Sequence, residues 1–265
     1  MYFSRSYRVF SWFADRRRDR LTRVPFPVQW EEILGRNVHP YSRLDEEGKA
    51  RLRAMIQVFV AEKSWDGGGG LEVTDEIRVT IAAHACLLLL GFRHDYYPNV
   101  QSIIVYPSAV VPPPRTPGFF ETVLEPVEEE GPLDGESFDQ GPVIIAWDAV
   151  VRSVRSPGSG ENVIYHEFAH KLDALDGAAD GTPPLRDRGA YREWSRIFSR
   201  EYMRLRKDVE RGRRSFLDDY AATNEAEFFA VATERFFDSP GFLLERAPEL
   251  YRVLQLYYGQ DPKGD

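Results

Sequence analysis

Apolar residues recur at helical spacing along most of the chain, with charged residues between them. In residues 44–63, for example, Leu52, Ile56 and Phe59 share one face of a helix. Residues 75–90 are apolar nearly all round, so a helix there would lie at the centre of the core. The pattern predicts helices at 25–36, 44–63, 75–90, about 163–173, 191–209, 221–237 and 247–258.

Fewer segments have the composition of β-strands. Residues 143–148 (Val-Ile-Ile-Ala-Trp-Asp) are the strongest candidate. Weaker candidates are residues 71–73, 102–106 and 118–124. Glycine and other turn residues predict a flexible break at 65–70 and a loop at 152–160.

These elements predict a mainly helical α+β fold, with one domain and a small β-sheet. We expect the domain to span residues 25–265. Its predicted parts are a helical half at about 25–100, the sheet at about 102–148 and a second set of helices at 161–265.

Residues 1–24 form a separate segment that is rich in aromatic and basic residues. Its short apolar run is interrupted by Arg5 and Arg8, and a basic cluster at 16–18 follows it. A secretory signal has the opposite order, with the positive charge first. We therefore expect an amphipathic segment that packs on the domain or contacts a partner.

Charge and cysteine content narrow the possible functions. The net charge is −8 and the pI is about 5.3, which argues against direct binding of nucleic acid. Cys86 is the only cysteine, so a disulfide within the chain and a cysteine-based zinc site are excluded. The longest apolar run, residues 81–92, contains His84 and is too short to span a bilayer. We expect a soluble, cytoplasmic protein in which His84 is a buried, hydrogen-bonded core residue.

The main chemical signal is the His-Glu-x-x-His motif at residues 166–170. On a helix, His166 and His170 lie one turn apart on the same face, so both imidazoles can bind one zinc ion. Glu167 is rotated by about 100° from His166 and can act as a base toward water activated by the metal. The motif predicts a zinc site, with Glu161 or Asn162 capping its helix.

Two later segments could supply a third zinc ligand. Asp176 follows His170 at the spacing of metzincins, but position 173, where that arrangement usually has Gly at a sharp turn, is Asp. Alternatively, Glu227 binds zinc from a later helix and Tyr220, seven residues earlier, directs its hydroxyl toward an oxyanion. We favour Glu227 over Asp176.

Three other carboxylates are candidates for lesser roles near the site. Glu234 is the reserve candidate for the third ligand. We expect Asp173, one turn after His170, to support the site from outside the ligand shell or to make a contact at the helix end. Asp148, at the end of a strand, could contact substrate or serve an ordinary turn.

Two motifs, His-Glu-Phe-Ala-His-Lys-Leu-Asp and Tyr-Ala-Ala-Thr-Asn-x-Ala-Glu-Phe-Phe-Ala, resemble the Mlc titration factor A family of gluzincin-type zinc peptidases. The spacing of Tyr and Glu is also similar to the catalytic domain of lethal-factor-type metalloproteases. The resemblance implies zinc ligands His166, His170 and Glu227, with Glu167 as base and Tyr220 as oxyanion stabiliser.

The resemblance also implies aminopeptidase activity on short peptides. A second role that it implies is sequestration of an Mlc-like, sugar-responsive transcription repressor, so a regulatory binding protein is the alternative function. From strand order and propensity, we further expect residues 143–148 to be an edge strand that pairs with a peptide substrate.

Overall fold

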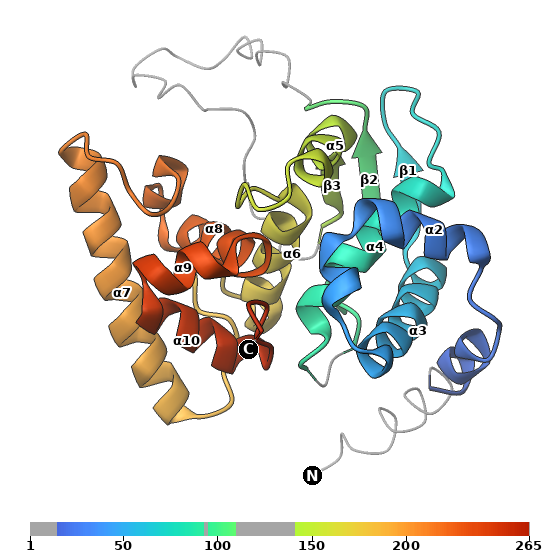
Figure 1. Ribbon diagram of the computed structural model, residues 1–265, viewed down its shortest axis with the longest axis horizontal. Coiled ribbons are helices and arrows are strands. Elements are labelled where there is room, and N and C mark those ends of the chain that lie inside the picture. The colour runs from blue at the N-terminus through green and yellow to red at the C-terminus, as the bar shows by residue number, and fades with distance from the viewer. Residues whose placement is uncertain (1–14, 93–94, 110–140, 265) are drawn as a thin grey trace, which may run out of the picture.

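The computed structural model describes residues 15–92, 95–109 and 141–264, and these form a mainly helical α+β fold (Figure 1). The α-helices are α2 (Val28–Asn37), α3 (Glu46–Glu62), α4 (Asp75–Leu89), α5 (Trp147–Arg155), α6 (Val163–Asp173), α7 (Arg188–Glu210), α8 (Glu225–Asp238), α9 (Pro240–Arg246) and α10 (Pro248–Tyr258). Short 3-10 helices are η1 (His39–Arg43), η2 (Ala174–Asp176) and η3 (Asp219–Ala222). The strands are β1 (Ser64–Gly67), β2 (Ser102–Tyr106) and β3 (Val143–Ala146). In the described part of the chain, no helix is long and apolar enough to cross a membrane.

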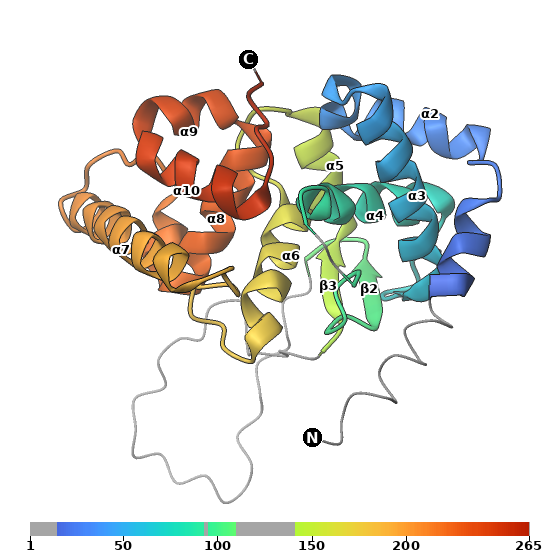
Figure 2. The ribbon, with the colours of Figure 1, turned by 90° about the horizontal axis from the view of Figure 1, so that it is seen from below.

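Helix α6 lies between two groups of helices (Figures 1 and 2). On one side are α2, α3, α4 and the sheet, and on the other are α7 to α10. α6 packs against both groups through α4 and α8. Buried apolar residues from both sides belong to one continuous core.

The buried helix α4 is the centre of the first group, as its sequence predicts. Thr74 caps it by accepting a hydrogen bond from the backbone N–H of Ile77. His84 is 4 % exposed, and its Nδ1 lies 2.9 Å from the carbonyl oxygen of Thr80. Burial lowers the pKa of His84 to about 4. The structure confirms that His84 is a buried, hydrogen-bonded core residue.

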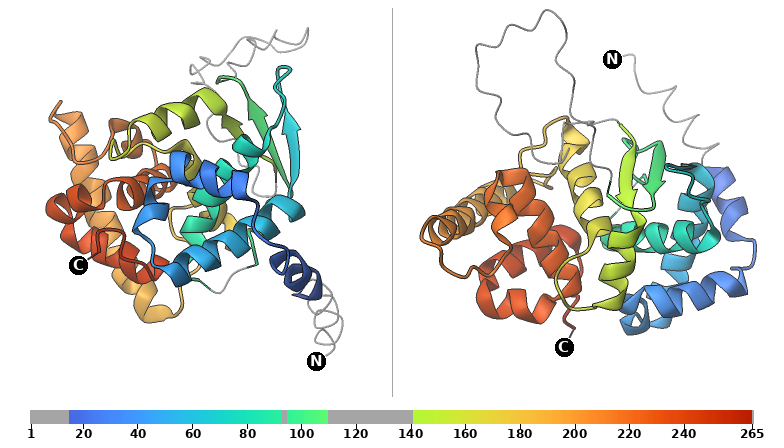
Figure 3. Two further views of the ribbon diagram at one scale, coloured as in Figure 1. Left: turned by 45° about the vertical axis from the view of Figure 1, so that its right-hand side comes forward. Right: turned by 90° about the horizontal axis from the view of Figure 1, so that it is seen from above.

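The sheet is parallel, with strand order β1-β2-β3 (Figure 3). Val143 and Ile145 point into the core, whereas Ile144 is 49 % exposed. Among the described residues β3 pairs only with β2, so it is an edge strand of this sheet. The predicted strands at 102–106 and 143–148 are confirmed, although β3 ends at Ala146.

The sequence-based prediction was wrong in the segments next to the strands. The first strand is β1, inside the predicted break at 65–70, and residues 71–73 are not a strand. β1 is held by pairing with β2, and the indole Nε1–H of Trp65 donates to the carbonyl of Val60. The pairing with β2 is a tertiary contact, and it outweighs the poor strand propensity of Asp and Gly.

The predicted loop at 152–160 is also partly wrong, because α5 begins directly after β3 and runs to Arg155. Helix α8 begins at Glu225, not at residue 221, and α9 was not predicted. The predicted strand at 118–124 lies outside the described residues.

The described end of the N-terminal segment is anchored to the rest of the protein. Residues 15–22 are helical, and Arg18 forms ion pairs with Glu62 at 2.8 Å and with Asp95 at 2.6 Å. The Arg18 guanidinium also lies over the ring of Tyr96, 4.7 Å from its centroid. This part of the segment therefore packs on the domain.

Candidate metal centre

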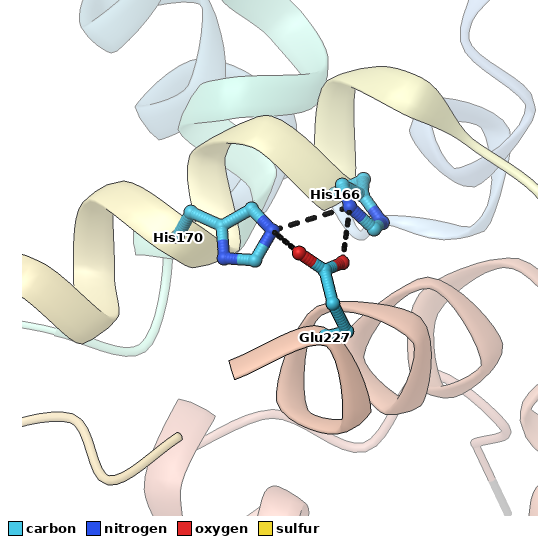
Figure 4. A group of neighbouring side chains, drawn as sticks. All are labelled: His166, His170 and Glu227. Atoms are coloured by element: carbon cyan, nitrogen blue, oxygen red, sulfur yellow. Dashed lines mark hydrogen bonds and ion pairs between the residues drawn. The ribbon is translucent and has the colours of Figure 1, made fainter. Parts of the chain in front are cut away.

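Helix α6 carries the His-Glu-x-x-His motif, and its N-terminus is capped. The side chain of Asn162 accepts hydrogen bonds from the backbone N–H groups of Ile164 and Tyr165. Ile164, Tyr165 and Phe168 are buried, so their side chains fix the rotation of the helix about its axis. His166 and His170 consequently share the face that looks toward α8 (Figure 4).

Glu227, in the first turn of α8, completes a cluster with the two histidines (Figure 4). The side chain of Asn224 caps α8 by accepting a hydrogen bond from the Glu227 backbone N–H. Glu227 is 7 % exposed and its carboxylate faces both imidazoles. Two helices that are distant in the sequence thus bring two nitrogens and a carboxylate together.

The distances within the cluster fit a tetrahedral ion. The two Nε2 atoms are 3.2 Å apart, and the carboxylate oxygens of Glu227 lie 3.1 Å from Nε2 of His166 and 3.4 Å from Nε2 of His170. A tetrahedral zinc ion with bonds of about 2.0–2.1 Å places its ligand atoms about 3.3 Å apart. Each of the three side chains can therefore offer one ligand atom to such an ion, which leaves a fourth position for another ligand.

The Oε2 atom of Glu227 gives a second indication that a cation fits here. It is buried and accepts no hydrogen bond, even though it lies 3.1 Å from His166. The oxygen and Nε2 of His166 thus lie close together without a hydrogen bond between them. An uncompensated buried carboxylate oxygen is costly, and a divalent cation between these atoms would remove that cost.

Glu234, two turns along α8 from Glu227, lies on the other side of the His166 ring. One of its oxygens lies 2.8 Å from Nδ1 of His166, and the other accepts a hydrogen bond from the backbone N–H of Asn162. Because a carboxylate only accepts, Nδ1 carries a proton, and Nε2 is the ring nitrogen that can face a metal. Glu234 is therefore not placed to be the third ligand, and its contact with Nδ1 was not foreseen from the sequence. The spacing of two turns from Glu227 was the available signal.

The charges of the cluster are strongly coupled. Burial opposes ionisation of both Glu227 and His166, but the attraction between the carboxylate and the imidazole outweighs it, with help from His170 and Glu234. The pKa of Glu227 falls to about 2, and that of His166 rises well above its usual value. Glu227 is thus ionised at neutral pH, as a cation ligand must be.

Glu167 lies beside the cluster on the same helix and is partly buried. Burial raises its pKa; His166 and His170 oppose this shift, and Glu227 adds to it. A carboxylate with a raised pKa takes up a proton more readily than an ordinary surface glutamate. This property suits a general base.

Tyr220 approaches the cluster from η3, the short helix before α8. Its ring centroid lies 6.1 Å from that of His166, and the residue is 36 % exposed. Asp218 caps η3 by accepting from the Tyr220 backbone N–H. Thr223 and Asn224 separate η3, which carries Tyr220, from α8, which carries Glu227. Tyr220 still lies beside His166 because η3 packs against α8.

The structure does not bring Asp176 to the cluster. The helix continues through Asp173, whose φ of −59° and ψ of −47° are right-handed, and the left-handed turn falls at Gly177, where φ is +90°. Asp176 is exposed, and its carboxylate accepts from the Ala178 backbone N–H. The sharp turn at position 173 that the metzincin-like arrangement needs is therefore absent.

Asp173 and Asp148 have structural contacts instead. Asp173 is fully buried and accepts a hydrogen bond of 2.8 Å from the backbone N–H of Gly181, which fastens the loop after α6. Burial raises the pKa of Asp173 to about 6.

Asp148 lies in the first turn of α5 and pairs with Arg152 at 2.9 Å. Its carboxylate thus stabilises a helix start.

Comparison with known proteins shows the family of the chain. Residues 12–259 match the family model of the glucose-regulated metallo-peptidase M90. The chain is 33 % identical to Mlc titration factor A of Serratia proteamaculans, over 89 % of this chain and 88 % of that protein. It is 31 % identical to Mlc titration factor A of Salmonella agona, over 88 % and 86 %. An uncharacterized protein of Synechocystis sp. is 39 % identical, over 94 % and 90 %. The chain therefore belongs to the glucose-regulated metallo-peptidase M90 family.

Proposed function

We propose that this protein is a zinc-dependent aminopeptidase, with His166, His170 and Glu227 as the zinc ligands. The observation that carries the proposal is the close approach of the ligand atoms. The two Nε2 atoms lie 3.2 Å apart, one carboxylate oxygen of Glu227 lies 3.1 Å from Nε2 of His166, and the other lies 3.4 Å from Nε2 of His170. Membership of a metallo-peptidase family supports the reaction type. Zinc held there would supply Lewis-acid chemistry, polarising a carbonyl and making water a nucleophile at neutral pH.

Three residues around the cluster would transfer the proton, stabilise the oxyanion and orient His166. Glu167 accepts a proton from the attacking water and returns it to the leaving amine. Tyr220, beside His166, donates its hydroxyl proton in a hydrogen bond to the developing oxyanion. Glu234 holds His166 in one orientation and one tautomer.

The substrate we propose is a short peptide that pairs with the open edge of β3. The exposed Ile144 and the absence of a described strand beyond β3 support this binding mode. The crystal structure of a peptide-inhibitor complex tests it. A peptide backbone without contacts to residues 143–148 would exclude pairing at this strand.

The test of the activity is hydrolysis of aminoacyl-anilides by the purified protein. We expect turnover to disappear with a chelator and to return when zinc is added, because the cluster supplies the ligands. The matched inactive control is the variant Glu167→Gln with the same zinc content as the wild type. If the zinc-loaded protein cleaves neither aminoacyl-anilides nor a peptide library, the aminopeptidase proposal fails.

A second candidate function is the binding of an Mlc-like transcription repressor in the cytoplasm. The name of the relatives, Mlc titration factor A, favours it. The single cysteine, Cys86, is buried and free, which suits a reducing compartment. Co-purification with the repressor of the source organism tests this role. Equal binding by the wild type and by Glu167→Gln would show that binding does not require catalysis.

A further inference from the structure

The end of α7 and the segment that follows it carry a concentration of basic side chains in an otherwise acidic protein. Residues 206–214 contain five basic residues and two acidic ones, whereas the whole chain has a net charge of −8. The basic residues, here called the basic strip, are Arg206, Lys207, Arg211, Arg213 and Arg214. All five are exposed to solvent. A surface with charges of one sign attracts ligands of the opposite sign.

The basic strip differs from the preceding arginines of α7 in its lack of carboxylate partners. Arg196, Arg200 and Arg204 form ion pairs with Glu201 or Glu249. Within the described part of the chain, none of the five strip residues forms an ion pair. The charges of the strip are therefore free to meet the carboxylates of a ligand.

The backbone that carries the strip is held in place at the end of the helix. The backbone N–H groups of Gly212 and Arg213 donate to the carbonyls of Val209 and Asp208, both at 2.9 Å. Directly after the strip, the side chains at positions 216 and 217 are buried in the core. The helix dipole favours cations only within the last turn, so it does not account for the two arginines at 213 and 214.

The strip is connected to the part of the site that carries Tyr220. The Arg206 guanidinium lies 5.8 Å from the centroid of the Tyr202 ring, and the Tyr202 hydroxyl donates to the carbonyl of Ala222 in η3. η3 also carries Tyr220, which lies beside the metal cluster. Arg214 precedes Tyr220 by six residues, so their Cα atoms are at most about 22 Å apart. An extended peptide covers this distance with about seven residues.

A short acidic stretch of polypeptide fits the strip better than other polyanions do. Residues 206–214 contain no aromatic side chain on which the bases of a single strand could stack. A long nucleic acid or an anionic membrane would also face the acidic remainder of the protein, which repels it. At physiological salt, attraction extends only about 8 Å from the strip, so it acts on a local group of carboxylates.

We propose that the basic strip binds an acidic segment of the peptide substrate, on the carboxyl side of the bond that is cleaved. An aminopeptidase cleaves the first peptide bond, so the rest of its substrate extends away from the metal cluster in one direction. Arginine guanidinium groups would pair with Asp and Glu side chains there. The inference rests on the proposed function and specifies its substrate class: peptides of about eight or more residues with an acidic C-terminal part.

The test compares two peptides of about ten residues that differ only in their last four residues, which are Glu in one and Gln in the other. With the zinc-loaded wild type, we expect kcat/KM to be about tenfold higher for the Glu peptide, mainly through KM. In the variant with Arg213→Glu and Arg214→Glu, this ratio should fall at least about fivefold, because attraction is replaced by repulsion. The wild-type preference should also weaken as salt is raised.

The matched control changes two arginines at the other end of the same helix, Arg188→Glu and Arg192→Glu. Both are exposed, and the 23 residues of α7 make a helix about 34 Å long, so the control alters the same charge far from the strip. The control should keep the wild-type ratio. Equal kcat/KM of the wild type for the two peptides, or an equal loss of the ratio in both variants, would overturn the proposal.

A binding measurement separates this inference from the proposed function. Fluorescence anisotropy of the labelled peptides on zinc-loaded Glu167→Gln needs no turnover. Tighter binding of the Glu peptide that is lost when Arg213 and Arg214 are changed to Glu supports the strip even if no peptide is cleaved. Cleavage of both peptides without such a binding difference would refute the strip and leave the peptidase proposal intact. Tighter binding of a single-stranded oligonucleotide than of the Glu peptide would also refute it.

Discussion

Helices α6 and α8 build the same cluster in different ways. α6 supplies two histidines from adjacent turns, so their proximity depends only on helix geometry. α8 supplies two carboxylates that approach the His166 ring from opposite sides, Glu227 at Nε2 and Glu234 at Nδ1. The geometry of α6 alone brings the two histidines together. α8 supplies the carboxylate that completes the cluster, Glu227, and the one that fixes the tautomer and orientation of His166, Glu234.

Removing Glu227 should have the largest effect. Glu227→Ala should purify with little zinc and no peptidase activity, because two imidazoles without the third ligand bind zinc weakly. Asp176→Ala is the control, since this exposed aspartate forms only a local turn contact. Metal analysis of both purified variants decides between them. Full zinc in Glu227→Ala together with loss in Asp176→Ala would reverse our assignment of the third ligand.

The change Glu167→Gln should affect the reaction without affecting the metal. Gln keeps the shape of Glu167 but cannot take up a proton, so turnover should fall at least about 10²-fold while the zinc content stays the same. Steady-state hydrolysis and metal analysis measure the two quantities. Turnover close to that of the wild type in the zinc-loaded variant would rule out Glu167 as the base.

Removing the charge of Glu234 should have an intermediate effect. Glu234→Gln exchanges one acceptor oxygen for an amide, so it cannot accept from both Asn162 and His166. We expect zinc affinity or activity to decrease about 10–100-fold. The control is Glu225→Gln, an exposed glutamate in the same helix. If the two variants bind zinc equally well and are equally active, the contact at Nδ1 does not support the site.

The smallest effect on the site is expected for Tyr220→Phe. The hydroxyl is proposed to act only on the oxyanion, so kcat should fall by less than in Glu167→Gln, with zinc content unchanged. Kinetics and metal analysis on the same preparation test this. Loss of zinc from Tyr220→Phe would mean that Tyr220 is a ligand or a structural support.

Several features of the protein were determined by the sequence alone. The spacing of His166 and His170, a cap at Glu161 or Asn162 and the apolar faces of α4 and α6 each depend on residues within one or two turns. Such local features follow from helix geometry and can be predicted without the fold. The resemblance to the Mlc titration factor A family, which the comparisons confirm, rests on similarly short motifs.

Tertiary structure decided what remained open. The structure places Glu227, and not Asp176, beside the two histidines, because the chain turns at Gly177 instead of residue 173 and α8 packs on α6. The position of Glu234 at Nδ1, the short strand β1 and the break before α8 depend on partners distant in the sequence. Hydrophobic burial is not directional, so a sequence pattern shows which face of a helix is buried but not which helix covers it. Only the packed core brought both carboxylates of α8 to His166.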